Sequence, residues 1–111
     1  MGQIRHYQLT LNGAAQQLSS ALPGTESAVI EDVSFRELKL QADDGNTNPI
    51  YVGGDNTVTA AAHGLRIPAP TAGVPAAPET FGGYDTGPLK LSKFWVIGTN
   101  NEILNVLGLT F

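Results

Sequence analysis

Two histidines carry the most versatile side-chain chemistry in this sequence. Two imidazoles and one carboxylate can hold a zinc ion, so a site built from His6, His63 and an acid is one hypothesis. His6, however, falls on the polar side of an alternating segment, and His63 stands beside Gly64 in a turn-like context. These positions favour the alternative, in which both imidazoles lie exposed on the surface.

Oxygen ligands for a cation are concentrated in the run DDGNTN at 43–48. Calcium loops of the EF-hand type space their Asp and Asn residues and place Gly at the sixth position and Glu at the twelfth. Here the acids and amides are bunched, as they also are in a polar turn, so a turn is favoured over a calcium site. The run YVGGDNT at 51–57 lacks the spacing of a phosphate-binding glycine loop and also predicts a turn.

Nucleophilic catalysis has no evident candidate. The chain contains no Cys and no Gly-x-Ser-x-Gly motif. Two carboxylates could act as a glycosidase pair, but ten scattered Asp and Glu residues give no spacing that singles one out. The sequence therefore predicts a protein that is not an enzyme and that uses no cofactor and no metal.

Composition narrows the class of partner. The 111 residues fit one domain, and the formal net charge of −4 argues against a protein that neutralises nucleic-acid phosphates or anionic lipid. No stretch reaches the about 20 apolar residues that cross a bilayer, and the first residues do not read as a signal peptide. We expect synthesis in a cytoplasm, without nucleic-acid or membrane partners. Charged residues make up only 14% of the chain, against about 25% in an average domain.

Alternating apolar residues predict that short β-strands position these side chains. In 4–11 the apolar Tyr7, Leu9 and Leu11 alternate with polar residues, and every second residue is apolar in the later part of 34–42. A helix is the competing interpretation of 34–42, because Glu, Leu and Lys favour helices, but the period of two and the abrupt polar stop favour a strand. Brief strands are also predicted at 50–52 and 57–59.

Two hairpins are predicted near the ends of the sequence. Asn12-Gly13 favours a tight turn, after which 14–22 returns as a second strand. Segments 89–98 and 102–111 flank the turn at 99–101. Within the second hairpin, Phe94 and Trp95 are adjacent, so one is expected to fill the core while the other faces solvent or a partner. Phe111, just beyond an apolar strand, is expected to dock in a sheet or on another subunit.

These elements predict an all-β fold, an antiparallel β-sandwich or small barrel that is jelly-roll-like, in one domain spanning 1–111. Residues 65–88 hold five of the seven prolines, a density that excludes regular helices and central strands, and form an irregular arm or loop. The arm is either an ordered strip that contacts a neighbour or a disordered loop. The candidate protein–protein contacts are Ile67, Pro68, Pro70, Val74, Pro75, Pro78, Phe81, Tyr84, Trp95 and Phe111.

The segment LKLQADDGNTNPIYVGGDNTVTAAAHG at 38–64 resembles small β-rich structural proteins of tailed bacteriophages. The segments QLTLNGAAQQLSSAL at 8–22 and LSKFWVIGTNNEILNV at 91–106 are similar to the first and last hairpins of such proteins. Together they cover most of the chain outside the arm. The arm departs from the pattern and leaves the exact role in the virion open.

The resemblance implies a component of the virion, and we expect a capsid decoration (cement) protein that binds and stabilises the assembled shell. Its expected partners are the major capsid protein, or another virion protein, and further copies of itself. A trimer is favoured because decoration proteins commonly occupy threefold sites. A neck or tail accessory protein is the first alternative. A carbohydrate-binding module that uses exposed aromatic residues such as Trp95 or Tyr84 is an alternative from a different class.

Overall fold

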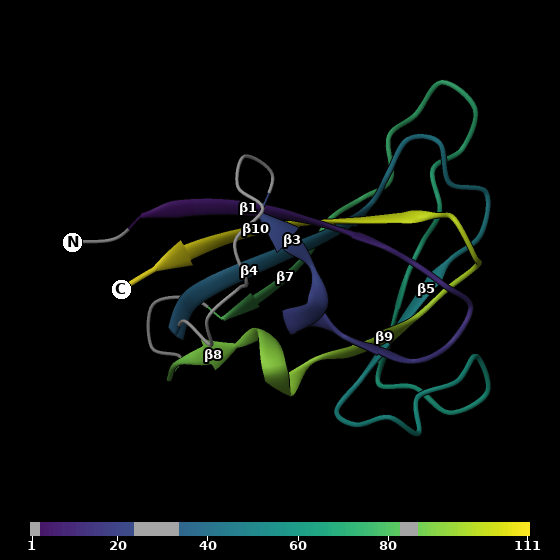
Figure 1. Ribbon diagram of the computed structural model, residues 1–111. Helices are drawn as coiled ribbons and strands as arrows, with labels where there is room; N and C mark the ends of the chain where they lie inside the picture. Colours follow the sequence, from purple (N-terminus) through teal and green to yellow (C-terminus); the bar gives the residue numbers. More distant parts are fainter. Residues whose placement is uncertain (1–2, 24–33, 83–86) are drawn as a thin grey trace.

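Two antiparallel β-sheets pack face to face in the computed structural model, which describes residues 3–23, 34–82 and 87–111 (Figure 1). Sheet A has the order β3-β1-β10-β4-β7, with β8 also paired to β4; sheet B has the order β2-β9-β5-β6. The strands of sheet A are β1 (Ile4–Thr10), β3 (Leu22–Pro23), β4 (Ser34–Ala42), β7 (Glu79–Gly82), β8 (Leu89–Lys90) and β10 (Ile103–Thr110). Those of sheet B are β2 (Gln16–Gln17), β5 (Ile50–Gly53), β6 (Leu65–Ile67) and β9 (Trp95–Ile97), and two 3-10 turns are η1 (Leu18–Ser20) and η2 (Leu91–Lys93).

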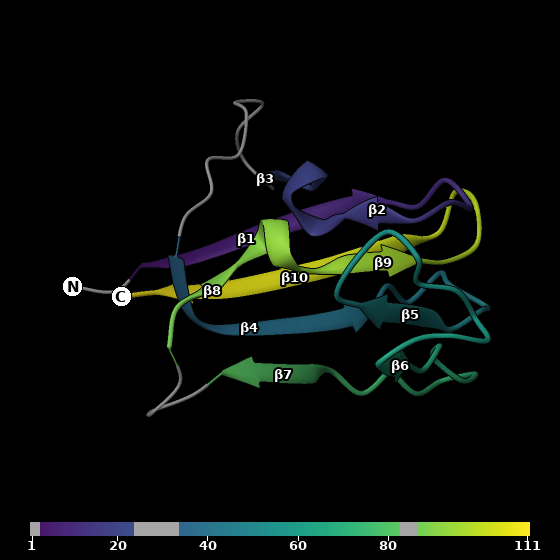
Figure 2. The same ribbon diagram turned by 90° about the horizontal axis from the view of Figure 1, so that it is seen from below.

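The strand orders of the two sheets correspond element by element. In sheet A, β1, β10, β4 and β7 lie side by side, and their chain neighbours β2, β9, β5 and β6 follow the same order in sheet B (Figure 2). Four lengths of chain therefore run in parallel tracks, and each crosses from one sheet to the other. This is the arrangement of a jelly roll, so the predicted antiparallel, jelly-roll-like sandwich is confirmed.

The predicted hairpin pairing is wrong directly at both turns, because these turns are corners between the sheets; further along the first return segment, Leu22 in β3 does pair with Gln8 of β1. β1 pairs with β10, whereas β2 pairs with β9. The two turns lie against each other: the Leu11 amide donates to the Glu102 carbonyl, and the Asn101 amide donates to the Leu11 carbonyl, both at 2.8 Å. Gly13 and Asn101 have φ of 82° and 70°, a left-handed conformation that Gly and Asn tolerate. The turn residues were recognised correctly, but they redirect the chain to the second sheet.

The strands predicted at 4–11, 34–42 and 50–52 are confirmed as β1, β4 and β5, and the helical alternative for 34–42 is excluded. The strand predicted at 57–59 is wrong. The Asp55 carboxylate accepts hydrogen bonds from the Thr57 amide and hydroxyl, which closes a turn. Val58 is buried there because it covers Gly53, where an added Cβ would lie 2.8 Å from the Val58 Cβ.

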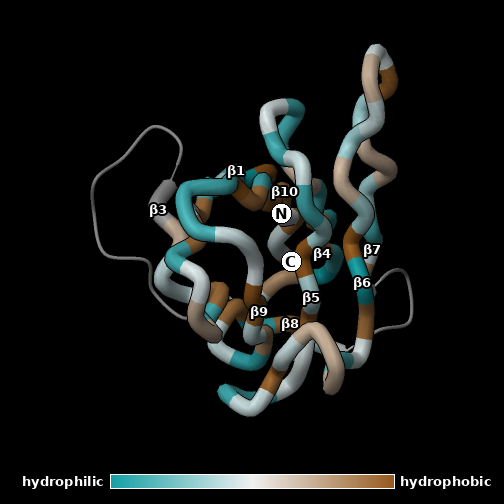
Figure 3. Tube along the Cα trace, turned by 90° about the vertical axis from the view of Figure 1, so that its right-hand side faces the viewer, coloured by the Kyte–Doolittle hydropathy of each residue, from teal (hydrophilic) through white to brown (hydrophobic). Residues whose placement is uncertain are grey.

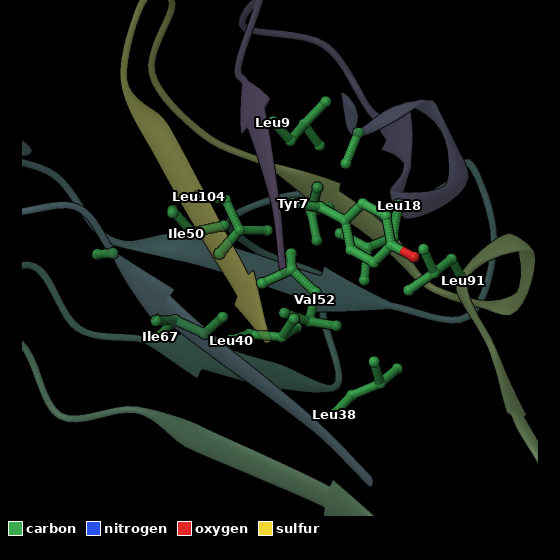
Figure 4. Close-up of a cluster of buried hydrophobic side chains, with 14 of the residues drawn as sticks. Tyr7, Leu9, Leu18, Leu38, Leu40, Ile50, Val52, Ile67, Leu91 and Leu104 are labelled. Carbon is green, nitrogen blue, oxygen red and sulfur yellow. The ribbon is translucent and has the colours of Figure 1, made fainter. Parts of the chain in front are cut away.

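The core lies between the two sheets, where side chains from both inner faces meet (Figure 4). Leu38, Leu40 and Leu104 come from sheet A, and Ile50 and Ile67 come from sheet B. The Phe35 ring is fully buried against the backbone of Gly108. Within the described ranges, no helix has the length and apolar character to cross a bilayer.

The segment 65–88 is not irregular throughout. Leu65–Ile67 is β6, one of the two edge strands of sheet B, and Glu79–Gly82 is β7, at the edge of sheet A opposite β3. The high proline content of 65–88 did not predict these two strands, because the prolines lie beside the strands and not inside them. Pro68 follows β6 directly, and Pro78 precedes β7. The name arm is used from here on for residues 68–78, which lie between these two strands.

Candidate functional site

The outer face of sheet A carries exposed apolar side chains beside polar ones. Strand register aligns its outward side chains in rows across β1, β10 and β4. One row is Ile4, Leu109 and Glu37, and the next is His6, Leu107 and Lys39. A third row is Gln8, Asn105 and Gln41. The face is therefore polar at the end of the third row and partly apolar at the end of the first two rows.

A shallow groove of about 580 Å³ runs over this face. Its lining includes His6, Gln8, Lys39 and Asn105, and Pro78 at the base of the arm borders it. The Gln8 amide donates to the Asn105 side-chain oxygen at 3.0 Å, so the floor is held across two strands. The groove therefore joins the sheet face to the arm in one continuous surface.

An apolar patch occupies the end of this face where β1 begins and β10 ends. It consists of Ile4, Leu107, Leu109 and Phe111. Ile4 is 74% exposed, Leu107 46% and Phe111 49%, while Leu109 is half-buried. The Arg36 guanidinium carbon lies 5.7 Å from the centre of the Phe111 ring, an arrangement that contributes a cation–π contact. Contiguous exposed apolar side chains on one face are typical of an interaction surface.

The arm projects from the other end of the molecule. Figure 3 shows it extending beyond the rest of the chain above β6 and β7, with hydrophobic residues at its tip. The Val74 amide donates to the Thr71 carbonyl at 2.9 Å, which closes the tip, and Val74 is 58% exposed. The base is anchored: Ala76 is buried, and the Gln41 side-chain amide donates to the Ala76 carbonyl at 2.5 Å. The arm is thus a hairpin-like projection with a fixed base and an exposed apolar tip.

The acidic run at 43–48 is a structural corner. Asn46 is buried; its amide nitrogen donates to the Ile103 carbonyl at 2.7 Å, and its oxygen accepts from the Ile103 amide at 3.0 Å. Asp43 accepts from the Asn105 side chain at 3.0 Å. These contacts form a turn, which the sequence favoured over a calcium loop.

Glu102 secures the same corner with its carboxylate. It accepts from the Thr47 amide at 2.8 Å, from the Thr47 hydroxyl at 3.1 Å and from the Asn48 amide at 3.2 Å. Desolvation by burial raises the pKa of Glu102, but the hydrogen bonds from Thr47 and Asn48 outweigh it and lower the pKa below its ordinary value. The pKa of Asp55 is also lowered, first by the hydrogen bond from the Thr57 side chain. Both carboxylates therefore hold turns in place.

The histidines lie apart and both are exposed, as the alternative to a zinc site predicted. His6 is on sheet A, whereas the His63 ring lies 4.6 Å from the Tyr51 ring beside sheet B. A depression of about 280 Å³ next to Tyr51 is lined by Asn48 and Thr99 among others. In the part of the chain that the structure describes, no three His, Asp or Glu side chains are grouped so as to hold a metal ion.

The predicted contact residues fall into different environments. Ile67 is fully buried opposite Ile50, so its assignment as a surface contact is wrong: it is a core residue. Phe81 is half-buried with its ring 5.1 Å from that of Phe94, and Trp95 is half-buried on the outer side of sheet B. Val74, Pro75, Pro78 and Phe111 are exposed, and Pro68 and Pro70 are half-buried. Tyr84 lies outside the described residues.

Sequence reasoning missed Ile4, Leu107 and Leu109. The signal was present in ILNVLGLT, where Leu104 and Val106 face the core while Ile103, Leu107 and Leu109 alternate with them. A strand that is apolar on both faces is expected to be covered on both.

Comparisons with known proteins give no relative from which a role could be transferred. No protein-family model, no curated protein and no solved structure matches the chain.

Proposed function

We propose that the chain is a structural protein of a bacteriophage virion, a capsid decoration protein that binds and stabilises the assembled shell. The observation that carries the proposal is the outer face of sheet A, which combines an exposed apolar patch, a groove and a projecting arm on one surface. Such a surface is suited to burial against protein, because charged side chains are sparse at interface cores.

The fold and the sequence support this role in different ways. The jelly roll is used by viral capsid proteins, and also by lectins and cupins, so it is compatible with a virion role without selecting it. The similarity of 8–22, 38–64 and 91–106 to phage structural proteins is what favours the virion. The net charge of −4 supports a protein partner over nucleic acid.

Self-association is part of the proposal. A domain of this size buries a limited fraction of its surface, so covering the apolar patch adds stability that the monomer lacks. We propose a homo-oligomer, and the trimer expected for threefold sites on a shell remains a prediction. Light scattering of the purified chain measures its mass against the 11.7 kDa of one copy.

The proposal is tested by binding to undecorated shells of the phage that encodes the chain. The wild type should co-sediment with shells, and Leu107→Glu should bind at least tenfold more weakly, about 1.4 kcal/mol. The new carboxylate would stand opposite Lys39 and His6, so the fold tolerates the charge. Ala61→Lys, an exposed position in the loop 54–64, is the matched control and should bind like the wild type. Failure of the wild type to bind shells would refute the decoration role.

Electron microscopy of the particle separates the shell from the first alternative. Density for the chain at the neck or tail, with none on the shell, would replace the decoration role by the accessory role. The chain would then bind a different virion protein.

The carbohydrate-binding alternative is favoured by one local observation. Tyr51 borders a depression that Asn48 and Thr99 also line, and an aromatic ring beside amide and hydroxyl groups suits a sugar. A glycan array tests it directly. Binding that Tyr51→Ala abolishes and Leu107→Glu preserves would favour the module over the virion protein.

A further inference from the structure

The arm tip and the apolar patch lie at opposite ends of one side of the molecule. In Figure 1 the arm rises at the right above β1, whereas β1 begins and β10 ends at the left. The patch remains exposed, with Ile4 at 74%, and so does Val74 at the arm tip. Neither surface is covered by the other within one chain.

The two surfaces match in chemistry. The arm sequence PAPTAGVPAAP contains no charged residue and no histidine. Its four prolines restrict the chain before docking, so less conformational entropy is lost on binding. An uncharged apolar arm is complementary to the apolar side chains of the patch, which Arg36, Glu37 and Lys39 border. Because the arm is uncharged, docking it beside Glu37 and Lys39 opposes no like charges.

The size of the two surfaces favours a second copy as the partner. The arm provides about 10 residues and the outer face of sheet A about as many, whereas one side of a stable interface has about 20 to 30. A partner that covered only one surface would leave the contact well below this size. A second copy covers the patch with its arm and offers its own patch, so each copy uses both surfaces.

We infer that the arm of one copy docks on the apolar patch of a second copy, and that this contact builds the oligomer. The inference rests on the proposed function, of which it specifies the self-association. Donor and acceptor are different surfaces, so every arm and every patch is filled either in a reciprocal pair or in a closed ring such as a trimer. Outward side chains of β10, in particular Leu107, receive the arm tip around Val74.

The test uses two variants that are each defective in one surface. Val74→Lys alters the arm tip and Leu107→Glu alters the patch. Each variant alone should self-associate at least tenfold more weakly than the wild type, measured by analytical ultracentrifugation. Mixed together, they should assemble again: the intact arm of one meets the intact patch of the other, and the introduced lysine meets the introduced glutamate. Native mass spectrometry resolves the two masses and should show both variants in one assembly.

Matched controls keep the result specific. Val74→Glu mixed with Leu107→Glu retains the apolar contact but opposes two carboxylates, so it should recover less than the mixture of Val74→Lys with Leu107→Glu. Urea denaturation of each variant verifies that the fold persists. The inference is overturned if folded variants do not recover on mixing, if each associates like the wild type, or if the wild type is monomeric up to roughly 1 mM, where a contact of about 4 kcal/mol would be populated.

Shell binding is measured separately, so the two proposals can fail independently. A monomeric wild type that still binds shells refutes the arm-to-patch contact and retains the decoration role. A pair of variants that recovers on mixing, with a wild type that does not bind shells, retains the contact and refutes the decoration role.

Discussion

Replacing Asn46 by Ala should lower the free energy of unfolding by about 2 kcal/mol. The side chain donates to the Ile103 carbonyl at 2.7 Å and accepts from the Ile103 amide at 3.0 Å. In Asn46→Ala the Ile103 carbonyl still accepts from the Asp43 amide at 3.1 Å. The carbonyl therefore loses only one of its two hydrogen bonds, which costs about 0.5 to 1.5 kcal/mol. The part-buried amide loses its Asn46 acceptor, and an unsatisfied donor costs about 1 to 3 kcal/mol when buried and less where water reaches it.

Urea denaturation followed by tryptophan fluorescence measures the loss. With a slope of about 1 to 3 kcal/mol per molar urea for a small domain, the midpoint should fall by roughly 1 M while the slope is unchanged. Asn100→Ala, at an exposed position in the neighbouring turn, is the control and should change the free energy by less than about 0.5 kcal/mol. A loss below about 0.5 kcal/mol for Asn46→Ala would refute the structural role of this corner.

Replacing Asn46 by Asp sharpens the test, because only the donor changes. At neutral pH a carboxylate oxygen would face the Ile103 carbonyl, and this repulsion should raise the pKa of the new acid. The penalty is then present above the folded pKa and shrinks as the pH falls, since the protonated acid can donate to the carbonyl again. A deficit relative to wild type that stays constant from neutral to acidic pH would contradict the assigned hydrogen bonds.

Three further outcomes follow from the structure. Gly108→Ala should lower the free energy of unfolding by about 1 to 3 kcal/mol in urea denaturation, because the added Cβ would lie 2.5 Å from the buried Phe35 ring. Gly54→Ala is the control, since no atom lies within 4 Å of its added Cβ, and it should change the free energy very little. Equal losses in the two variants would contradict this packing. Glu102→Gln should reduce stability by about 0.5 to 1 kcal/mol at pH 7. Folding lowers the pKa of Glu102, so its contribution to stability is present above the pKa of the unfolded state and is lost as the pH falls through the pKa of the folded state. A difference in stability between Glu102→Gln and the wild type that does not change with pH would refute this role. Replacing the arm tip 71–74 by two glycines should leave the unfolding midpoint unchanged, since the buried base is retained, and a large loss would assign the tip to the monomer core.

Much of the fold could be predicted because alternation reports burial directly. Tyr7 and Leu9 in β1 and Leu38 and Leu40 in β4 face the core as the period of two requires. Pairing partners could not be predicted in the same way. Asn12-Gly13 permits both a tight hairpin and a corner, and the choice is made by β9, which pairs with β2 in the second sheet far along the chain.

The contact surface was predictable only in part. Val74 and Phe111 are exposed as an interaction role requires, but Ile67 was assigned to the arm because proline density suggested irregular backbone. In the structure, the three residues of β6 pair with β5, and this pairing buries Ile67. Leu107 was readable as apolar, yet whether it pointed inward or outward depended on the register of β10 between β1 and β4.

The prolines at the ends of the arm have a second consequence for assembly. β6 and β7 are edge strands, and unpaired edges invite further strands from other chains. Both edges are short, and Pro68 and Pro78 stop them on the arm side, because proline has no amide hydrogen to donate to an added strand. Extension of the sheet is thereby disfavoured at the place where the arm leaves it. The opposite edge strands, β2 and β3, have only two residues each. In the proposed oligomer, side chains of the outer face and the arm tip therefore make the contact, and the sheet is not continued.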